Sequence, residues 1–147
     1  MEFIVQVRNS QFEKSLLNKV ARVANSLERE VEQELKVSLK LTFSQLRVLN
    51  GLLIIGEASQ RKLAEALEVT PAVITRQAEA LGRQGLVEQR AKSKRENLLA
   101  LTKKGEGAVL DGTKIVEECR VRVLGSLSRR DEVAFETAVD SLEKSLA

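Results

Sequence analysis

The sequence contains a single proline, Pro71, and it stands where a helix can begin. Thr70, just before it, is a favoured N-cap residue, and proline at the first helical position loses no hydrogen bond and has its φ already set. After it, Ile74, Ala78 and Leu81 recur at the spacing of one helix face. Because no other proline interrupts the chain, the remaining segments are free to be mostly helical.

The segment around this helix has a recognisable order of parts. Ser59 is a favoured cap for a short preceding helix, and residues 68–69 form the turn between the two helices. Gly85 stops the second helix. Two short apolar-rich runs follow, residues 86–90 and 97–101, joined by the polar, basic sequence AKSKRE, which has the length of a hairpin connection. Helix, turn, helix and two-stranded hairpin together predict a winged helix-turn-helix, a module that reads DNA.

Two helices are predicted before this module. From Gln11 to about Leu39, apolar residues recur at steps of three and four, which indicates one face of a long helix. A helix of about 25 residues spans nearly 40 Å, so it packs either on its own domain or also on a second subunit. Thr42 or Ser44 caps a second, largely apolar helix that we expect to be central and buried. Before both, residues 3–7 form either a short strand or an ordered arm.

Two further helices are predicted after the module. Thr102 caps a helix that runs through Leu127, and Ser128 with Asp131 resembles a capping box for the last helix. Three glycines weaken the first turns of the Thr102 helix by about 1 kcal/mol each relative to Ala, which predicts a bend or an irregular start. They are Gly105, Gly107 and Gly112. The expected fold is therefore mainly α with a small β-hairpin wing.

Charge is distributed unevenly along the chain. The formal net charge is only +3, from 24 basic and 21 acidic residues. Residues 57–104 carry ten basic and six acidic side chains, whereas residues 105–147 carry six basic and nine acidic ones. This asymmetry favours one face that meets phosphates and another that meets protein or water.

The composition argues against catalysis and metal binding. With no histidine in the chain, neither a Ser-His-Asp nor a Cys-His arrangement can form, and no imidazole ligand is available. We expect no enzyme activity, no cofactor and no metal. The lone cysteine, Cys119, lies on an apolar helix stripe and is expected to be a buried core thiol in a reducing, cytoplasmic setting. No apolar run reaches the roughly 18 residues needed to span a bilayer, and the N-terminus does not resemble a signal peptide.

Candidate DNA-contacting residues lie on three parts of the module. On the Pro71 helix, Thr75 and Arg76 face outward, where they can reach phosphates or base edges in the major groove. Arg95 at the hairpin tip is the candidate for insertion into the narrow, negative minor groove. Any one of these side chains alone would more often be a solvated surface residue, but their combination predicts DNA contact. The full set is Ser59, Gln60, Arg61, Thr70, Pro71, Ala72, Val73, Thr75, Arg76, Gln77, Arg90, Lys92, Lys94 and Arg95.

The sequence resembles the MarR family of bacterial and archaeal transcription regulators over nearly its whole length. The matching stretches are LTFSQLRVLNGL, SQRKLAEALEVTPAVITRQAEALGRQGLVEQR and LLALTKKGEG. The order of a long helix, a winged helix-turn-helix and two more helices also matches. One departure lies in the wing, where Ser93 stands at the position that commonly carries an orienting Asp.

The resemblance implies a homodimer that binds double-stranded DNA at a pseudo-palindromic operator, usually as a repressor. Many members of the family release DNA when a small anionic or phenolic ligand binds. It further implies one MarR-like domain, with residues 1–40 and 106–147 as dimerisation helices and residues 41–105 as the DNA-binding lobe. Apolar candidates for the dimer interface are Phe12, Leu16, Val116, Val123, Leu142 and Leu146.

Two alternatives to this interpretation remain. In the first, the winged fold serves as a protein-interaction or assembly adaptor without specific DNA binding, which the basic excess of the module disfavours. In the second, the protein is chiefly a ligand sensor, a role that is compatible with DNA binding. The absence of Tyr and Trp means that a ligand response rests on the family resemblance alone.

Overall fold

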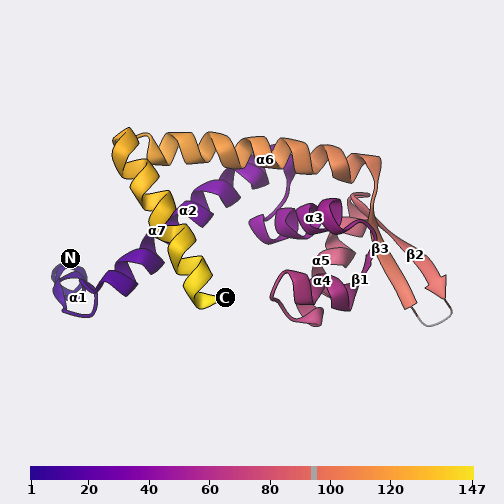
Figure 1. Ribbon diagram of the computed structural model, residues 1–147, viewed down its shortest axis with the longest axis horizontal. Coiled ribbons are helices and arrows are strands. Elements are labelled where there is room, and N and C mark those ends of the chain that lie inside the picture. Colours follow the sequence, from indigo (N-terminus) through magenta and orange to yellow (C-terminus); the bar gives the residue numbers. More distant parts are fainter. Residues whose placement is uncertain (94–95) are drawn as a thin grey trace.

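One long helix, α6, runs along the length of the molecule and joins its two ends (Figure 1). At one end lie three short helices and a small sheet, and at the other lie α1, the start of α2, and α7. The computed structural model describes residues 1–93 and 96–147. The elements in chain order are α1 (Glu2–Asn9), α2 (Leu16–Leu39), α3 (Phe43–Ile55), β1 (Ala58–Ser59), α4 (Gln60–Ala66), α5 (Pro71–Arg83), β2 (Val87–Ser93), β3 (Glu96–Leu101), α6 (Lys103–Leu124) and α7 (Arg129–Leu146).

Hydroxyl side chains define where the helices begin. Each helix from α2 to α7 is preceded by a Ser or Thr whose side chain accepts a hydrogen bond from a backbone N–H of the first turn, which satisfies a donor that would otherwise lack a partner. Thr42 also forms a capping box with Gln45. These caps are Ser15, Thr42, Ser59, Thr70, Thr102 and Ser128.

The N-terminal segment differs from the sequence-based expectation in two ways. The long helix predicted from Gln11 begins at Leu16, because Ser15 caps it and the preceding residues form turns. Phe12 therefore lies outside the helix. Residues 3–7, for which a strand or an arm was open, are part of α1.

The sheet has three strands instead of the predicted two. β1 adds to the far side of β3, so that the order is β1-β3-β2 and both pairs are antiparallel. Ala58 pairs with Leu99. The wing strands β2 and β3 also extend further into the connection than expected, with an irregularity in the register between Ala91 and Ser93. Lys94 and Arg95 lie outside the described residues.

The buried core lies in the lobe formed by α3, α4, α5 and the sheet, together with the start of α6. As predicted, α3 is central: half of its large apolar residues are buried, including Leu49, which is fully inaccessible. Ile74, Ala78 and Leu81 supply the inner face of α5, also as predicted. Among the described residues, no helix is long and apolar enough to cross a membrane.

The predicted bend at the start of α6 is wrong, because the helix is continuous from Lys103 to Leu124. Two of the three glycines are instead sites of close packing. A Cβ at Gly105 would overlap the carbonyl oxygen of Leu86, and a Cβ at Gly112 would overlap the side chain of Leu46. The loss of helix propensity is thus offset by close contact between α6 and the lobe. The helix also ends three residues before the expected Leu127.

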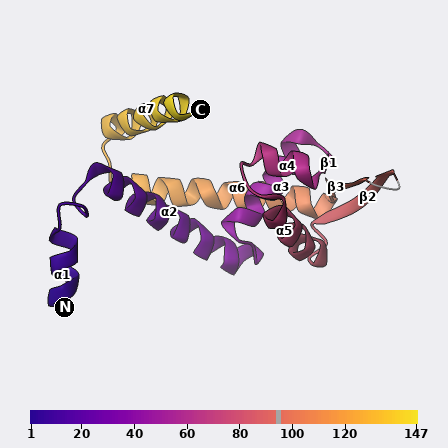
Figure 2. The same ribbon diagram turned by 90° about the horizontal axis from the view of Figure 1, so that it is seen from below.

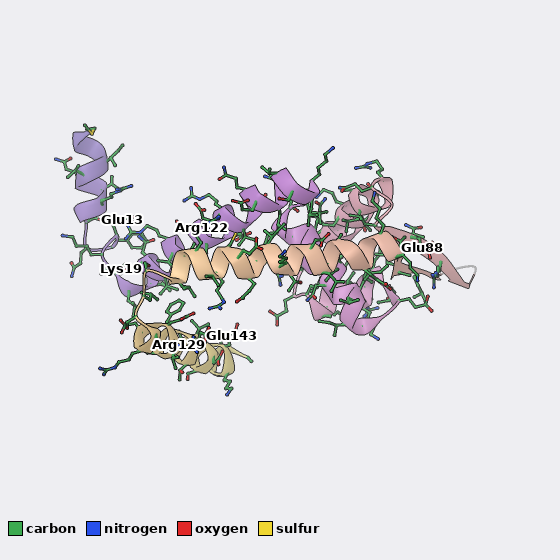
Figure 3. All side chains as sticks on the ribbon, turned by 90° about the horizontal axis from the view of Figure 1, so that it is seen from above. Glu13, Lys19, Glu88, Arg122, Arg129 and Glu143 are labelled. Carbon is green, nitrogen blue, oxygen red and sulfur yellow. The ribbon has the colours of Figure 1, made fainter. Side chains whose placement is uncertain are left out.

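The distal end of α6 carries α7, which stands clear of α2 (Figure 2). None of the described residues of α7 is buried. An ion pair between Arg120 of α6 and Glu132 of α7 spans 2.5 Å and holds the two helices together. On the other side of α6, Arg122 pairs with Glu30 and Glu34 of α2 at 3.4 and 3.3 Å (Figure 3).

Candidate nucleic-acid interface

Helix α5 exposes the face that sequence analysis assigned to DNA. Thr75, Arg76 and Glu79 are exposed, as are Pro71 and Ala72 at its start. Val73 and Gln77 are half-buried at the edges of this face. Thr70 caps the helix through a hydrogen bond from the backbone N–H of Val73. The start of α5 therefore presents short and polar side chains from a fixed backbone.

Two hydrogen bonds hold polar side chains of α5 to neighbouring helices. Oγ1 of Thr75 lies 2.6 Å from Oε1 of Gln60, the first residue of α4, and 3.0 Å from the carbonyl oxygen of Pro71. Nε2 of Gln77 donates to Oγ of Ser44 at 3.3 Å, so Gln77 points toward α3 and not outward. Neither partner could be predicted from the sequence, because pairs 15 and 33 residues apart leave no local signal.

Two arginines on the exposed surface of α4 and α5 differ in whether they form an ion pair within the part of the protein that the structure describes. Arg61 at the start of α4 pairs with Glu65 at 3.1 Å, on the surface. Arg76 is exposed, and within the described residues the ion pairs of the lobe involve Arg61 and Arg90 but not Arg76. Ser59 is half-buried and caps α4 through the N–H of Lys62. Arg76 thus offers a guanidinium that needs no rearrangement to meet a phosphate or a base.

Of the four basic residues predicted for the wing, only Arg90 has a described side chain. Its guanidinium contacts Glu88 at 2.6 Å and Glu57 at 3.7 Å. Hydrogen bonding and charge attraction from Glu88 raise the pKa of Arg90, with a smaller contribution from Glu57. Lys92 lies on β2. Lys94 and Arg95 fall outside the described residues, so the minor-groove candidate stays a prediction.

The start of α6 is joined to the end of α5 through main-chain carbonyls. Oγ1 of Thr102 donates to the carbonyl of Gly85 at 2.7 Å, and its backbone N–H donates to the carbonyl of Leu86 at 3.2 Å. Nζ of Lys104 donates to the carbonyl of Gln84 at 2.8 Å. These three bonds fix the direction of α6 relative to α5.

The six residues predicted for a dimer interface lie away from this face. Leu16, Leu142 and Leu146 are exposed, the last with 85% of its surface accessible. Phe12 is also exposed, in the turn before α2. Val116 and Val123 on α6 are half-buried and line an apolar hollow of about 180 Å³ under Phe135 of α7.

Cys119 is buried beside the same hollow, as expected of a core thiol. Burial raises the pKa of its thiol, and the nearby Arg122 offsets this only in part. The thiol form is therefore favoured near neutral pH.

A capped helix-turn-helix followed by an antiparallel wing defines a winged helix-turn-helix protein. Residues 39–96 match the sequence model of the MarR family. The matched residues cover most of the winged helix-turn-helix, so this part of the chain is similar to MarR-family proteins, which are transcription regulators and not enzymes. No curated protein matches the sequence.

Solved structures have the same fold along nearly the whole chain. MepR, a regulator of a multidrug efflux pump in Staphylococcus aureus, is 19% identical, with a TM-score of 0.73 over 90% of this chain and 99% of MepR. BpsR of Bordetella bronchiseptica is 21% identical, with a TM-score of 0.77 over 92% of this chain and 98% of BpsR. The organohalide-sensing regulator RdhR-CbdbA1625 is also 21% identical, with a TM-score of 0.77 over 92% of this chain and 85% of its own.

Proposed function

We propose that this regulator is a homodimer that binds specific double-stranded DNA at a pseudo-palindromic operator and acts as a repressor. The observation that carries the proposal is the exposed start of α5, where Thr75 and Arg76 project from a helix fixed by its cap and by the start of α6. A helix presented in this way fits the major groove, with its first turns at the base edges. Ser59, Gln60 and Arg61 at the start of α4 lie on the adjoining surface and are assigned to the DNA backbone.

Dimerisation is supported by where the protein exposes apolar side chains. A monomer rarely leaves so many large apolar groups in water along neighbouring helices. We assign residues 1–40 and 106–147 to the dimer region and residues 41–105 to the DNA-binding lobe. The exposed apolar residues of the dimer region include Ile4, Val5 and Val7 on α1, Leu16, Leu17, Val20 and Val23 on α2, and Val133, Phe135, Val139, Leu142 and Leu146 on α7.

Relatives with this fold support a small-molecule response. RdhR-CbdbA1625 is known in a form bound to 2,4-dichlorophenol, and 6-hydroxynicotinic acid regulates the DNA binding of BpsR. We propose that a small phenolic or anionic effector releases this protein from DNA. Adding a panel of such compounds to the DNA complex tests this point, and release by none of them at millimolar concentration contradicts it.

The DNA-binding proposal is tested by selecting bound duplexes from a random library and measuring affinity by fluorescence anisotropy. Arg76→Ala should weaken specific binding by about 1–3 kcal/mol if the side chain reads a base. Arg83→Ala removes the same charge from the last turn of α5 and should have a smaller effect. Affinity should fall steeply with salt, because each neutralised phosphate contributes about −0.9 to the slope of log K against log salt concentration. If no duplex binds even at low salt, the proposal fails and the adaptor alternative gains support.

The dimer proposal is tested by light scattering during size-exclusion chromatography. Leu142→Glu places a charge on the apolar face of α7 and should shift the protein toward a monomer. Ile54→Glu makes the same kind of change on α3, outside the proposed interface, where the side chain is also exposed. It should leave the mass unchanged. A wild-type protein that is monomeric at micromolar concentration contradicts the proposal.

A further inference from the structure

We propose that Arg90 is a positioning residue that ties the wing to the lobe and is not one of the residues that contact DNA. The inference rests on the proposed DNA binding and concerns how the wing of the same site is held. The sequence pattern placed Arg90 among the DNA-contacting residues, whereas its side chain contacts two carboxylates of the protein.

The guanidinium of Arg90 joins the two edge strands of the sheet. Glu88, two residues earlier on β2, lies on the same face, and its Oε1 accepts hydrogen bonds from Nε and Nη2 at 2.8 and 2.6 Å. Nη1 lies 3.7 Å from Oε2 of Glu57, which directly precedes β1 at the opposite edge. Because β3 lies between β1 and β2, this side chain reaches across the central strand.

The contact between Arg90 and Glu57 lies at a hollow beside the central strand β3. Ala100 of β3 pairs with Glu88, and its small side chain lines the same hollow as Arg90. Ala100 and Arg90 line a hollow of about 290 Å³, together with Glu57 and Glu106. A larger residue in place of Ala100 would obstruct the approach of the guanidinium to Glu57.

The base of the wing is joined to the lobe by Val87 and Leu99, which are buried in the core, and Arg90 adds a polar contact further along the hairpin. The hairpin projects from the molecule (Figure 1), and β1, which pairs with β3 on the side away from β2, is two residues long. Glu88, labelled in Figure 3, lies at the base of this projection. Arg90 meets a carboxylate from the wing and another from the segment just after Gly56, which ends α3. If Arg90 left these carboxylates to bind a phosphate, two unpaired negative charges would lie beside DNA, which is unfavourable.

The test compares charge-neutralising variants of the full chain by anisotropy, on the selected duplex and on a scrambled one. Glu57→Gln and Glu88→Gln should each weaken specific binding by about threefold or more, although both remove a negative charge that repels DNA. Glu106→Gln is the matched control, because it lies in the same hollow and no ion pair within the described residues joins it to Arg90. It should bind as tightly as the wild type or slightly more tightly.

Arg90→Lys separates positioning from phosphate contact. An ammonium group keeps the charge but cannot reproduce the fork that reaches both carboxylates. A positioning role predicts that Arg90→Lys loses specific affinity about as much as Glu57→Gln, while binding to the scrambled duplex changes less than twofold. A fold defect would lower both affinities and would be visible as a lowered melting temperature.

The opposite pattern overturns the inference. If Glu57→Gln and Glu88→Gln tighten binding more than Glu106→Gln does, and Arg90→Lys keeps full affinity, Arg90 is a DNA contact restrained by its carboxylates. If the wild type binds DNA and no variant differs from it, the inference alone fails. If the wild type binds no duplex, the proposed function fails and the inference with it.

Discussion

Two glycines in the first turns of α6, Gly105 and Gly107, should respond in opposite directions to substitution by alanine. The new Cβ at Gly105 would overlap the carbonyl oxygen of Leu86 and lie 3.0 Å from Cδ2 of Leu101. At Gly107 no neighbouring atom lies within 4 Å of the same position. The two glycines lie in the same helix and differ only in the atoms that a new Cβ would contact.

The magnitudes follow from helix propensity and packing. Alanine is favoured over glycine inside a helix by about 1 kcal/mol, so Gly107→Ala should raise the free energy of unfolding by up to that amount. Gly105→Ala gains the same term, but overpacking costs typically 1–3 kcal/mol and occasionally more. The neighbour is a backbone carbonyl, which cannot rotate away as a side chain can. We therefore expect a net loss of about 2 kcal/mol, from an overpacking cost at the upper end of that range.

The assay is urea unfolding followed by circular dichroism, at one fixed protein concentration because the stability of the proposed dimer would depend on it. The urea concentration at the midpoint of unfolding should rise for Gly107→Ala and fall for Gly105→Ala. The slope of the unfolding free energy against urea concentration should change little. If Gly105→Ala is as stable as the wild type, the close approach of α6 to Leu86 is not a real constraint. If both variants lose stability equally, the difference in their surroundings does not explain the effect.

Three further predictions concern other parts of the chain. Lys40 ends α2 with φ of 56°, a conformation that favours glycine, so Lys40→Gly should stabilise the protein by up to about 1 kcal/mol in urea unfolding. Hydrogen bonding to Lys36 lowers the pKa of Glu32, with a further hydrogen bond from the N–H of Phe43. The resulting stability is present above the unfolded-state pKa and is lost as pH falls through the lower folded-state pKa, so Glu32→Gln should reduce the fall in stability below about pH 4. Cys119, buried and with a raised pKa, should react with a thiol reagent at pH 8 at least about tenfold more slowly in the folded protein than in urea.

The parts of the fold that depend on local chemistry could be predicted from the sequence. A hydroxyl that caps a helix acts on donors within three residues, so Thr42, Ser59, Thr70 and Thr102 marked real helix starts. The inner face of α5 could be predicted because the spacing of its apolar residues along the chain is also a local property. The MarR resemblance was confirmed by the family model over residues 39–96.

The features that sequence analysis missed depend on contacts between distant segments. A strand of two residues such as β1 has no periodicity, and it exists because β3 offers a free edge. The glycines of α6 looked like weak points because their neighbours, Leu86 and Leu46, cannot be read from the helix itself. The pairing of Arg90 with Glu57 joins residues 33 positions apart, which hid its contacts at the wing.

The hydrogen bonds that join α5 to the start of α6 have a consequence for the proposed DNA binding. On the α5 side, the bonds are accepted by the main-chain carbonyls of residues 84–86, so they do not depend on the side chains of the outward face of α5. Thr75 and Arg76 on the outward face take no part in the joint. Replacing the outward residues of α5 should therefore change which DNA sequence is bound while the direction of α6 stays the same. Under the proposed function, DNA specificity could thus be redesigned, or diverge between relatives, without a change in the arrangement of the helices.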